Sequence, residues 1–392
     1  MSLEFRELLK KIGSGTHTGE SLTRDESAIA SRMMLLGDAT PAQIGAFLIS
    51  HRIKRPTGEE LAGMLDTYDQ LGPKLTPPNP PFRGGINEEL TPPNPPFRGG
   101  INEELPPLVR GENEELTPSK RPFSGRTVVL GVPYDGRSRT APISPLTALL
   151  LTTVGVSVIM HGGGRMPTKE ALPLIEVWQG LGVDWTKLSL SQVQTVFNTT
   201  YLGFVNLASH FPQAEHFVTY RREIGKRAPF ATMELIWTPY TGDAHIISGY
   251  VHPPTEIMFR EALAIRDFKA FTSIKGLEGS CDIPRDRTAI IGYTHPHDEY
   301  PDNFERLLLH PRDYGFAGKE VPLESTSQLI EEMTGVLQGK KSELMLSAIW
   351  NGGFYLWHCG ICTDLNQGLS KAETLFTNGE VSQKLELLRQ AV

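Results

Sequence analysis

Apolar side chains recur at helical spacing through the first part of the chain, and several positions carry the signals with which helices begin. Residues 3–12 are amphipathic, with apolar positions three or four apart. Thr23 is followed three residues later by Glu26, the pattern of a capping box, and Pro41 stands where a helix would start. These signals predict about four short helices, which we assign to an N-terminal helical domain over residues 1–75.

The hydrophobic pattern changes after residue 125. Residues 126–131 form a β-branched apolar run that ends in glycine, and a turn-rich loop and an apolar helix follow. A second such run at 156–162 is again followed by glycines and a helix. Two strand–loop–helix units in succession favour a parallel sheet. We therefore predict an α/β domain over 117–392, with a central, mainly parallel sheet flanked by helices and two amphipathic helices at its end.

A repeat separates the two domains. Residues 76–90 read TPPNPPFRGGINEEL, residues 91–105 repeat them without a change, and 106–116 hold a shorter copy. Proline and glycine dominate, and each copy has too few apolar side chains to offset the entropy lost on ordering. We interpret 76–116 as a disordered insertion in an older linker, and a proline-rich docking segment is the alternative.

Composition narrows the class of protein. The formal net charge is −7, and the three Arg and seven Glu of the repeat contribute −4, which leaves −3 for the rest. This acidity argues against nucleic-acid binding driven by overall charge, but it leaves a local basic cleft open. No apolar run reaches the roughly 18 residues of a membrane span, no signal-peptide pattern opens the chain, and three cysteines cannot form a disulfide framework. We expect a cytoplasmic protein without a membrane contact.

The turns after the two strands have the composition of an anion site. Strand, glycine turn and helix in this order bring backbone N–H groups and a helix N-terminus together. Arg137 and Arg139 add positive charge to the first turn, and Arg165 and Lys169 add it to the second. Any tight turn of this kind uses glycine, so a purely structural turn competes with this interpretation. His161, at the second strand end, is more typical of a core histidine than of a catalyst.

Several segments resemble the anthranilate phosphoribosyltransferase family. The helical signals LTRDES and GDATPAQIGAFLISHRIKRPTGEELAGM are similar to its helical domain. The family's GTGGD, Asn-x-Ser-Thr and Lys-His-Gly-Asn segments correspond to 131–135, 142–145 and 160–163, although their Asn, Thr and Lys positions differ here. The stretch 134–151 is closer to a divergent branch, part of which is linked to nucleic-acid binding rather than to tryptophan synthesis. The family residues that are kept are Gly131, Asp135, Ser144, His161 and Gly162.

The resemblance implies phosphoribosyl transfer from phosphoribosyl pyrophosphate to an aromatic or nitrogenous acceptor. It also implies a homodimer formed through the N-terminal helices, with Mg²⁺ as a candidate cofactor. The residues of the two turns that we predict to bind the substrate are Gly131, Asp135, Gly136, Arg137, Arg139, Thr140, Ser144, His161, Gly162, Arg165 and Lys169.

Two later segments extend the resemblance to an acceptor and a metal. The segment YRREIGKR is similar to the family's Arg-x-x-Leu-Gly-x-Arg, which places Arg221 where the acceptor carboxylate is held; a solvated basic helix face is equally compatible. The family's Asp-Gly-x-Asp-Glu metal motif aligns with EGSCD, where Cys281 replaces an acid. Because Mg²⁺ prefers oxygen ligands, we expect a weakened site in which Glu278 and Asp282 hold one ion.

Two other functions remain open at this stage. A nucleoside phosphorylase shares the architecture and would need a phosphate site but no diphosphate Mg²⁺ site. A non-catalytic nucleic-acid-binding protein would use a basic groove along the phosphate backbone. The side chains available for that groove are Arg137, Arg139, Arg165, Lys169, Arg221, Arg222, Lys226 and Arg227.

Overall fold

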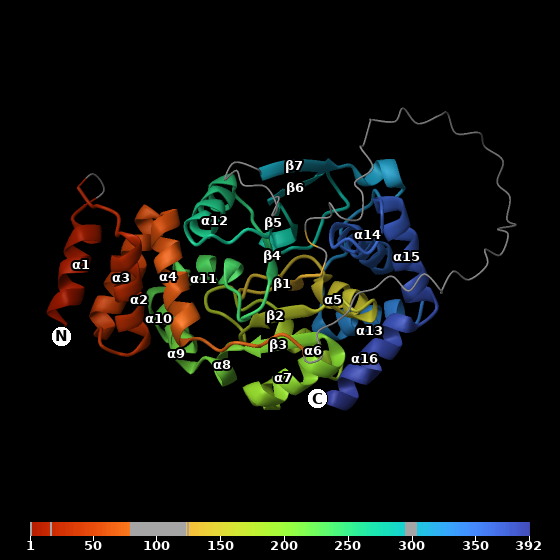
Figure 1. Ribbon diagram of the computed structural model, residues 1–392, viewed down its shortest axis with the longest axis horizontal. Coiled ribbons are helices and arrows are strands. Elements are labelled where there is room, and N and C mark those ends of the chain that lie inside the picture. Colours follow the sequence, from red (N-terminus) through yellow and green to blue (C-terminus); the bar gives the residue numbers. More distant parts are fainter. Residues whose placement is uncertain (1, 16–17, 79–122, 124, 295–303) are drawn as a thin grey trace, which may run out of the picture.

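The chain folds into a helical part at one end and a larger α/β part around one sheet (Figure 1). The computed structural model describes residues 2–15, 18–78, 123, 125–294 and 304–392. The predicted fold class, a small helical domain joined to an α/β domain with a mainly parallel sheet, is confirmed. Nearly all of the repeat at 76–116 lies outside the described residues, so its interpretation stays a prediction.

The first four helices begin at the positions that the sequence signals indicate. Thr23, Thr40 and Thr57 each cap a helix with a complete capping box, in which the threonine and the residue three positions later bond each other's backbone N–H. Such a cap stabilises a helix by about 1 kcal/mol. The four helices are α1 (Leu3–Gly13), α2 (Arg24–Leu35), α3 (Pro41–Lys54) and α4 (Gly58–Leu71).

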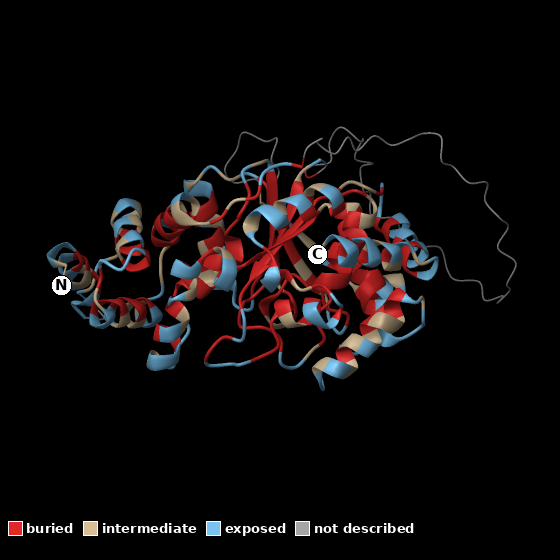
Figure 2. Ribbon diagram, turned by 90° about the horizontal axis from the view of Figure 1, so that it is seen from below, coloured by how far each residue is buried: buried red, intermediate tan, exposed pale blue. Residues whose placement is uncertain are grey.

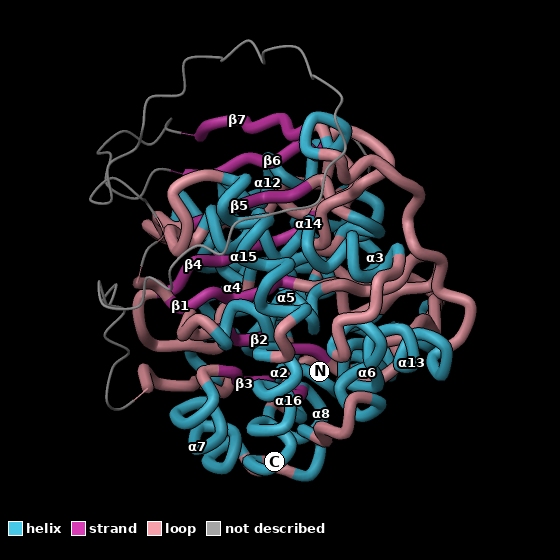
Figure 3. Tube along the Cα trace, turned by 90° about the vertical axis from the view of Figure 1, so that its right-hand side faces the viewer, coloured by secondary structure: helices cyan, strands magenta, loops and turns pink. Residues whose placement is uncertain are grey.

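One sheet organises the α/β part. Its seven strands lie in the order β3-β2-β1-β4-β5-β6-β7 (Figure 3). The strands from β3 to β5 in that order are parallel, and β6 and β7 pair antiparallel at one edge. The strands are β1 (Thr127–Gly131), β2 (Val158–Gly162), β3 (Leu202–Asn206), β4 (Ala244–Gly249), β5 (Phe271–Ile274), β6 (Ala289–Thr294) and β7 (Phe304–Leu309).

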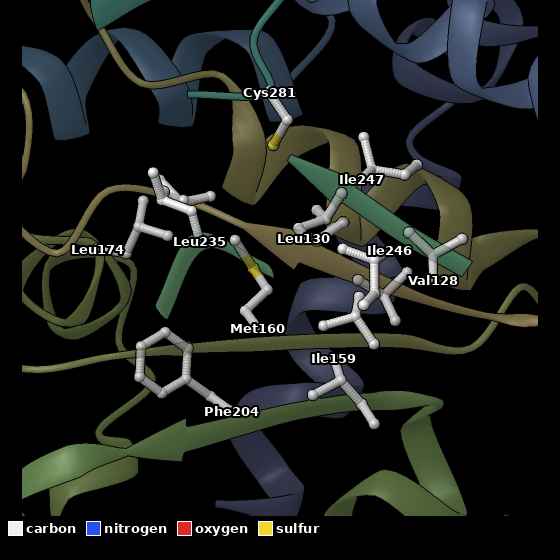
Figure 4. Close-up of a cluster of buried hydrophobic side chains, with 14 of the residues drawn as sticks. Val128, Leu130, Ile159, Met160, Leu174, Phe204, Leu235, Ile246, Ile247 and Cys281 are labelled. Carbon is white, nitrogen blue, oxygen red and sulfur yellow. The ribbon is translucent and has the colours of Figure 1, made fainter. Parts of the chain in front are cut away.

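The core lies on both faces of this sheet. Every residue of β1 to β5 is buried (Figure 2), and since successive side chains point to opposite faces, both faces must be covered. Figure 4 shows one apolar cluster at the centre of the sheet, with Leu130 of β1, Met160 of β2 and Phe204 of β3. Leu174 and Cys281 join it from outside the sheet. The parallel strands are therefore buried on both faces up to the turns that follow them.

The helices of the α/β part pack around the sheet and against the helical part. Helix α10 contacts α3, while α11 and α12 contact α4, so the later chain helps to hold the N-terminal helices. None of the described helices is long and apolar enough to cross a membrane. These helices are α5 (Ser144–Thr153), α6 (Leu174–Gly180), α7 (Leu190–Thr200), α8 (Leu207–His210), α9 (Pro212–Glu215), α10 (Phe217–Ile224), α11 (Phe230–Met233), α12 (Pro253–Ile265), α13 (Thr326–Leu337), α14 (Glu343–His358), α15 (Leu365–Thr377) and α16 (Glu380–Ala391).

The C-terminal end contains three helices, α14 to α16, where the sequence predicted two. The apolar period continues through α15 and α16, but Gly379 between them adopts a left-handed φ of 83° and ends the continuous helix. Helix α14 ends at His358, and Cys359 and Cys362 are buried just beyond its last turn. The proposed domain boundaries themselves remain predictions.

Candidate functional site

The two predicted turns lie side by side at the carboxyl edge of the sheet. Strand β1 lies between β2 and β4, so the chain leaves it in opposite directions; such a switch point is where open α/β sheets bind ligands. The backbones of Arg137 and Leu172 bond each other at 2.9 Å in both directions. Lys169 Nζ donates to the carbonyl oxygen of Gly136 at 3.0 Å. The structure therefore brings the turn after β1 and the turn after β2 together.

Close backbone contacts explain two of the glycines. A Cβ on Gly131 would lie 1.9 Å from the carbonyl oxygen of Leu235, and one on Gly136 would lie 2.4 Å from that of Leu172. Gly136 also has a φ of +72°, which strains any other residue. At Gly162 the nearest side-chain atom would be 3.5 Å away, so packing does not demand glycine there. A role of these glycines towards a ligand stays a prediction.

The carboxylate of Glu278 fills the first turn. The backbone N–H groups of Ser138, Arg139 and Thr140 donate to it at 3.3, 3.0 and 3.1 Å. The hydroxyl groups of Ser138 and Thr140 donate to it at 3.1 Å each. We call residues 138–140 the anion loop, because three successive amides aimed at one oxyanion form the concave site known as a nest.

Three cations complete the surroundings of Glu278. Lys169 Nζ donates to its carboxylate at 3.0 Å, and the Nε atoms of Arg137 and Arg139 lie 3.4 and 3.7 Å from it. The Glu278 side chain is 4% exposed. Burial alone would raise the pKa of Glu278, but the hydrogen bonds from Lys169 and the Arg139 amide, together with the charge of Arg137, hold that pKa well below its usual range. Glu278 is therefore an anion throughout the physiological pH range.

Asp282 occupies the adjoining end of helix α5. Its carboxylate accepts hydrogen bonds from the Ile143 amide at 3.1 Å, the Ser144 hydroxyl at 2.6 Å and Arg137 Nη1 at 2.7 Å. Helix α5 has no side-chain cap of its own, so Asp282 supplies the negative charge that a helix N-terminus favours. Arg137, whose side chain is 2% exposed, also donates to the hydroxyl of Ser280 at 2.7 Å. Arg137 and Ser144 thus bond to acceptors of the chain itself.

A second polar cluster surrounds Arg221. Its Nη2 donates to the Asp135 carboxylate and, at 2.8 Å, to the carbonyl oxygen of Pro167. The exposed Arg227 pairs with the other oxygen of Asp135. The side chains of Arg221 and Asp135 are each 4% exposed. Among the described residues, the buried Nε of Arg221 has no hydrogen-bond partner. The guanidinium therefore keeps one N–H for a further acceptor.

His161 lies at the end of β2, next to Tyr134 and Trp237. The Tyr134 hydroxyl is hydrogen-bonded to Nδ1 of His161 at 2.5 Å. The rings of His161 and Trp237 meet edge-to-face, with centroids 5.2 Å apart. Burial lowers the pKa of His161 to about 3. The imidazole is therefore neutral at physiological pH and contributes hydrogen bonding and shape rather than positive charge.

Glu234 belongs to the same region, and the sequence analysis missed it. It begins the 3₁₀ helix η3 (Glu234–Ile236) and accepts a hydrogen bond from the Tyr68 hydroxyl of α4 at 3.1 Å. Burial raises the pKa of Glu234 to about 8, against the opposing charge of Arg221. The signal that could have revealed it is a single acid in the apolar run PFATMELIW, since unpaired acids are rarely buried.

The remaining basic residues differ in exposure and in pairing. Arg165 pairs with Glu176 at 2.7 Å. The Arg139 side chain is 78% exposed, and Arg222 and Lys226 are exposed on α10 and after it. Together with the pairs described above, most of these positive charges are neutralised by acids of the same chain. This arrangement does not favour the hypothesis of a nucleic-acid groove.

The two residues assigned to Mg²⁺ do not fit a cation in this structure. Mg²⁺ needs oxygen lone pairs in octahedral order. The carboxylates of Glu278 and Asp282 instead face N–H and O–H donors and share the guanidinium of Arg137. Within the described ranges, no group of three or more His, Cys, Asp or Glu side chains is placed to hold a metal. Both aligned acids are instead bonded to N–H and O–H donors and to cations of the chain itself.

Comparison with known proteins places both parts of the chain in one family. The helical bundle domain of a glycosyl transferase family matches residues 6–72, and the a/b domain of the same family matches residues 135–382. An anthranilate phosphoribosyltransferase of Methylococcus capsulatus is 23% identical over 389 residues, which cover 98% of this chain and 97% of that protein. An uncharacterized protein of Aquifex aeolicus is 26% identical over 250 residues, which cover 62% of this chain and 72% of that protein.

Solved structures share the fold at low identity. Anthranilate phosphoribosyltransferase from Saccharomyces cerevisiae in complex with PRPP and Mg has a TM-score of 0.75 at 13% identity, covering 100% of this chain and 98% of that chain. The enzyme from Thermus thermophilus has a TM-score of 0.67 at 17% identity, covering 99% and 98%. These matches confirm the resemblance inferred from the sequence, and the chain belongs to the glycosyl transferase family defined by this helical bundle and this a/b domain.

Proposed function

We propose that this chain is a glycosyltransferase that moves a phosphoribosyl group from phosphoribosyl pyrophosphate to an aromatic or nitrogenous acceptor that carries a carboxylate. Family membership supports the class of reaction, and the full-length relatives are named for this activity. We also propose, as the sequence predicts, that the chain forms a homodimer through its N-terminal helices and that it is cytoplasmic.

The observation that carries the proposal is the state of Arg221. A guanidinium buried to 4% exposure, with an Nε–H that meets no acceptor among the described residues, is suited to a carboxylate guest. An unsatisfied buried donor costs about 1–3 kcal/mol, and a guest that accepts its hydrogen bond removes this cost. Trp237 adds a second buried N–H without a partner in the described part of the chain, and its ring contacts His161.

The proposed chemistry asks the protein for position and electrostatics rather than for covalent work. Loss of diphosphate leaves an oxocarbenium-like sugar, and an acceptor held in line attacks it. Arg221 would orient the acceptor through its carboxylate. The neutral imidazole of His161, held by Tyr134, would border the acceptor and donate or accept a hydrogen bond without adding charge.

The test is release of pyrophosphate from phosphoribosyl pyrophosphate in the presence of anthranilate and a panel of other aromatic carboxylates, with and without added Mg²⁺. Arg221→Ala removes the charge-assisted hydrogen bond from Nε to the acceptor, so kcat/KM should fall about ten- to a hundredfold. Arg222→Ala changes the exposed neighbour on α10 and is the matched control, expected within about twofold of wild type. A wild-type protein that releases no pyrophosphate with any acceptor of the panel ends the proposal.

A further inference from the structure

The anion loop directs more hydrogen-bond donors at its present ligand than that ligand has lone-pair positions. Six groups donate to the Glu278 carboxylate: the amides of Ser138, Arg139 and Thr140, the hydroxyls of Ser138 and Thr140, and the ammonium of Lys169. A carboxylate has about four lone-pair positions on its two oxygens, so several donors must share one. A phosphate group offers three strong acceptor oxygens and more charge, and it suits this set of donors better.

The backbone around Glu278 is shaped to deliver its side chain into the loop. Glu278 has φ 53° and ψ 23°, in the left-handed region that residues with a side chain rarely adopt. Gly279 follows it with φ +82°, and a Cβ on Gly276 would lie 1.9 Å from the carbonyl oxygen of Ser280. An unfavourable backbone conformation persists only where its surroundings hold it in place, and here the surroundings are the donors of the anion loop.

The same site has a side that solvent can reach. The Lys169 side chain is 35% exposed and that of Arg139 is 78% exposed, whereas Glu278 itself is 4% exposed. An anion approaching from solvent would therefore meet two positive charges before it reaches the amides. The carboxylate sits behind these cations as a ligand that has already bound.

We propose that Glu278 is an internal ligand of the anion loop, which closes an oxyanion site until residues 277–279 withdraw and a phosphate group replaces the carboxylate. The site is then a latched phosphate site rather than a metal site. That the physiological ligand is the diphosphate of a donor rests on the proposed function. The test of the site does not depend on that function, because binding of inorganic pyrophosphate requires no turnover.

Glu278→Gly opens the loop and suits the left-handed backbone at that position. Pyrophosphate binding to the full chain is measured by calorimetry in Mg²⁺-free buffer, and the variant should bind at least about tenfold more tightly than wild type. Acetate should raise the Tm of the variant but not of wild type, since it restores the missing carboxylate. Glu176→Gln removes a carboxylate from Arg165 in the neighbouring turn and is the matched control, with pyrophosphate affinity within about twofold of wild type.

Equal pyrophosphate affinity of wild type and Glu278→Gly, or no binding by either, overturns the inference. Should the variant not fold, hydrogen exchange of the wild-type chain decides. Closure requires the amides of 138–140 to be protected without any anion, and rapid exchange there contradicts it. If the variant gains pyrophosphate binding while no acceptor is ever used, the latch stands and the proposed function fails. If wild type turns over the donor while its pyrophosphate affinity matches that of the variant, the function stands and the latch fails.

Discussion

The anion loop and the cluster around Arg221 lie at the same edge of the sheet and each surrounds a buried carboxylate, Glu278 in the first and Asp135 in the second, but they differ in how far the chain fills the site with its own groups. In the anion loop, Glu278 and Asp282 accept every hydrogen bond described for the loop amides and the Ser144 hydroxyl. Both regions hold a buried guanidinium Nε without a hydrogen-bond partner among the described residues, but that of Arg137 lies 3.4 Å from the Glu278 carboxylate, whereas Arg221 pairs with Asp135 through Nη2 rather than Nε. Beside Arg221, Glu234 has a pKa raised to about 8 by burial.

This difference separates two ways of binding a ligand. A guest at Arg221 gains a hydrogen bond to a group that is otherwise unsatisfied, so nothing of equal strength has to be displaced. A guest at the anion loop must compete with an intramolecular carboxylate, whose effective concentration is high because the chain holds it there. The first region is prepared for a ligand, and the second is already occupied by one.

The largest expected effect comes from breaking the occupied region at Asp282. Asp282→Ala leaves the 2%-exposed guanidinium of Arg137 without its closest anion and removes the acceptor at the N-terminus of α5. Loss of one partner of a buried ion pair costs about 3–5 kcal/mol, so the free energy of unfolding from urea titration should fall by that amount. Asp286→Asn alters an exposed neighbour and should change it by less than about 0.5 kcal/mol.

A second substitution shows whether the loss arises from the unpaired charge. Arg137→Met in the Asp282→Ala background removes the uncompensated guanidinium and should restore part of the lost stability. If Arg137→Met lowers the unfolding free energy of Asp282→Ala by as much as it lowers that of wild type, the two residues are not coupled. The pair would then not be the reason why the first turn is closed.

The second-largest effect concerns the cluster around Arg221 and appears as a pH dependence of the unfolding free energy. Between the ordinary carboxyl pKa of 4.5 and about 8, folded Glu234 keeps a proton that the unfolded chain releases. The unfolding free energy therefore falls by about 1.4 kcal/mol per pH unit across this window on account of Glu234. Glu234→Gln removes this contribution, so between pH 5.5 and 7.5 the variant should gain about 2–3 kcal/mol relative to wild type. Glu223→Gln, exposed on α10, should run parallel to wild type, and a parallel Glu234→Gln would refute the raised pKa.

The fold was predictable because its signals are local. Thr23 and Thr40 cap helices with partners three residues away, and the β-branched run at 126–131 becomes a buried strand. The number of closing helices was wrong because the break at Gly379 depends on one left-handed residue within a continuous apolar period. Local pattern therefore predicts where elements exist more reliably than where one ends.

The site was predictable only in its composition. The turns that carry Arg137 and Lys169 were identified, and they do lie together. That Glu278 would fill the first turn was not predictable, because it joins the loop across about 140 positions of sequence and its motif resembles a metal site. Whether an acid near Arg137 binds a cation or replaces an anion depends on which donors surround it, and only the folded chain shows that.

The smallest expected effect sharpens the comparison at Lys169. Lys169→Met removes one of the donors to Glu278, but this ammonium is partly exposed and screened, so the unfolding free energy at pH 7 should fall by only about 0.5–1 kcal/mol. Because the folded pKa of Glu278 lies well below its ordinary value of 4.5, the carboxylate is still charged at pH 4, so the difference between variant and wild type should persist at pH 4. Lys187→Met, whose side chain is 80% exposed, should show no such difference. If Lys169→Met lowers the unfolding free energy by well above 1 kcal/mol, this side chain rather than the backbone amides contributes most to binding Glu278. An anion could then open the loop by competing with Glu278 for the lysine alone.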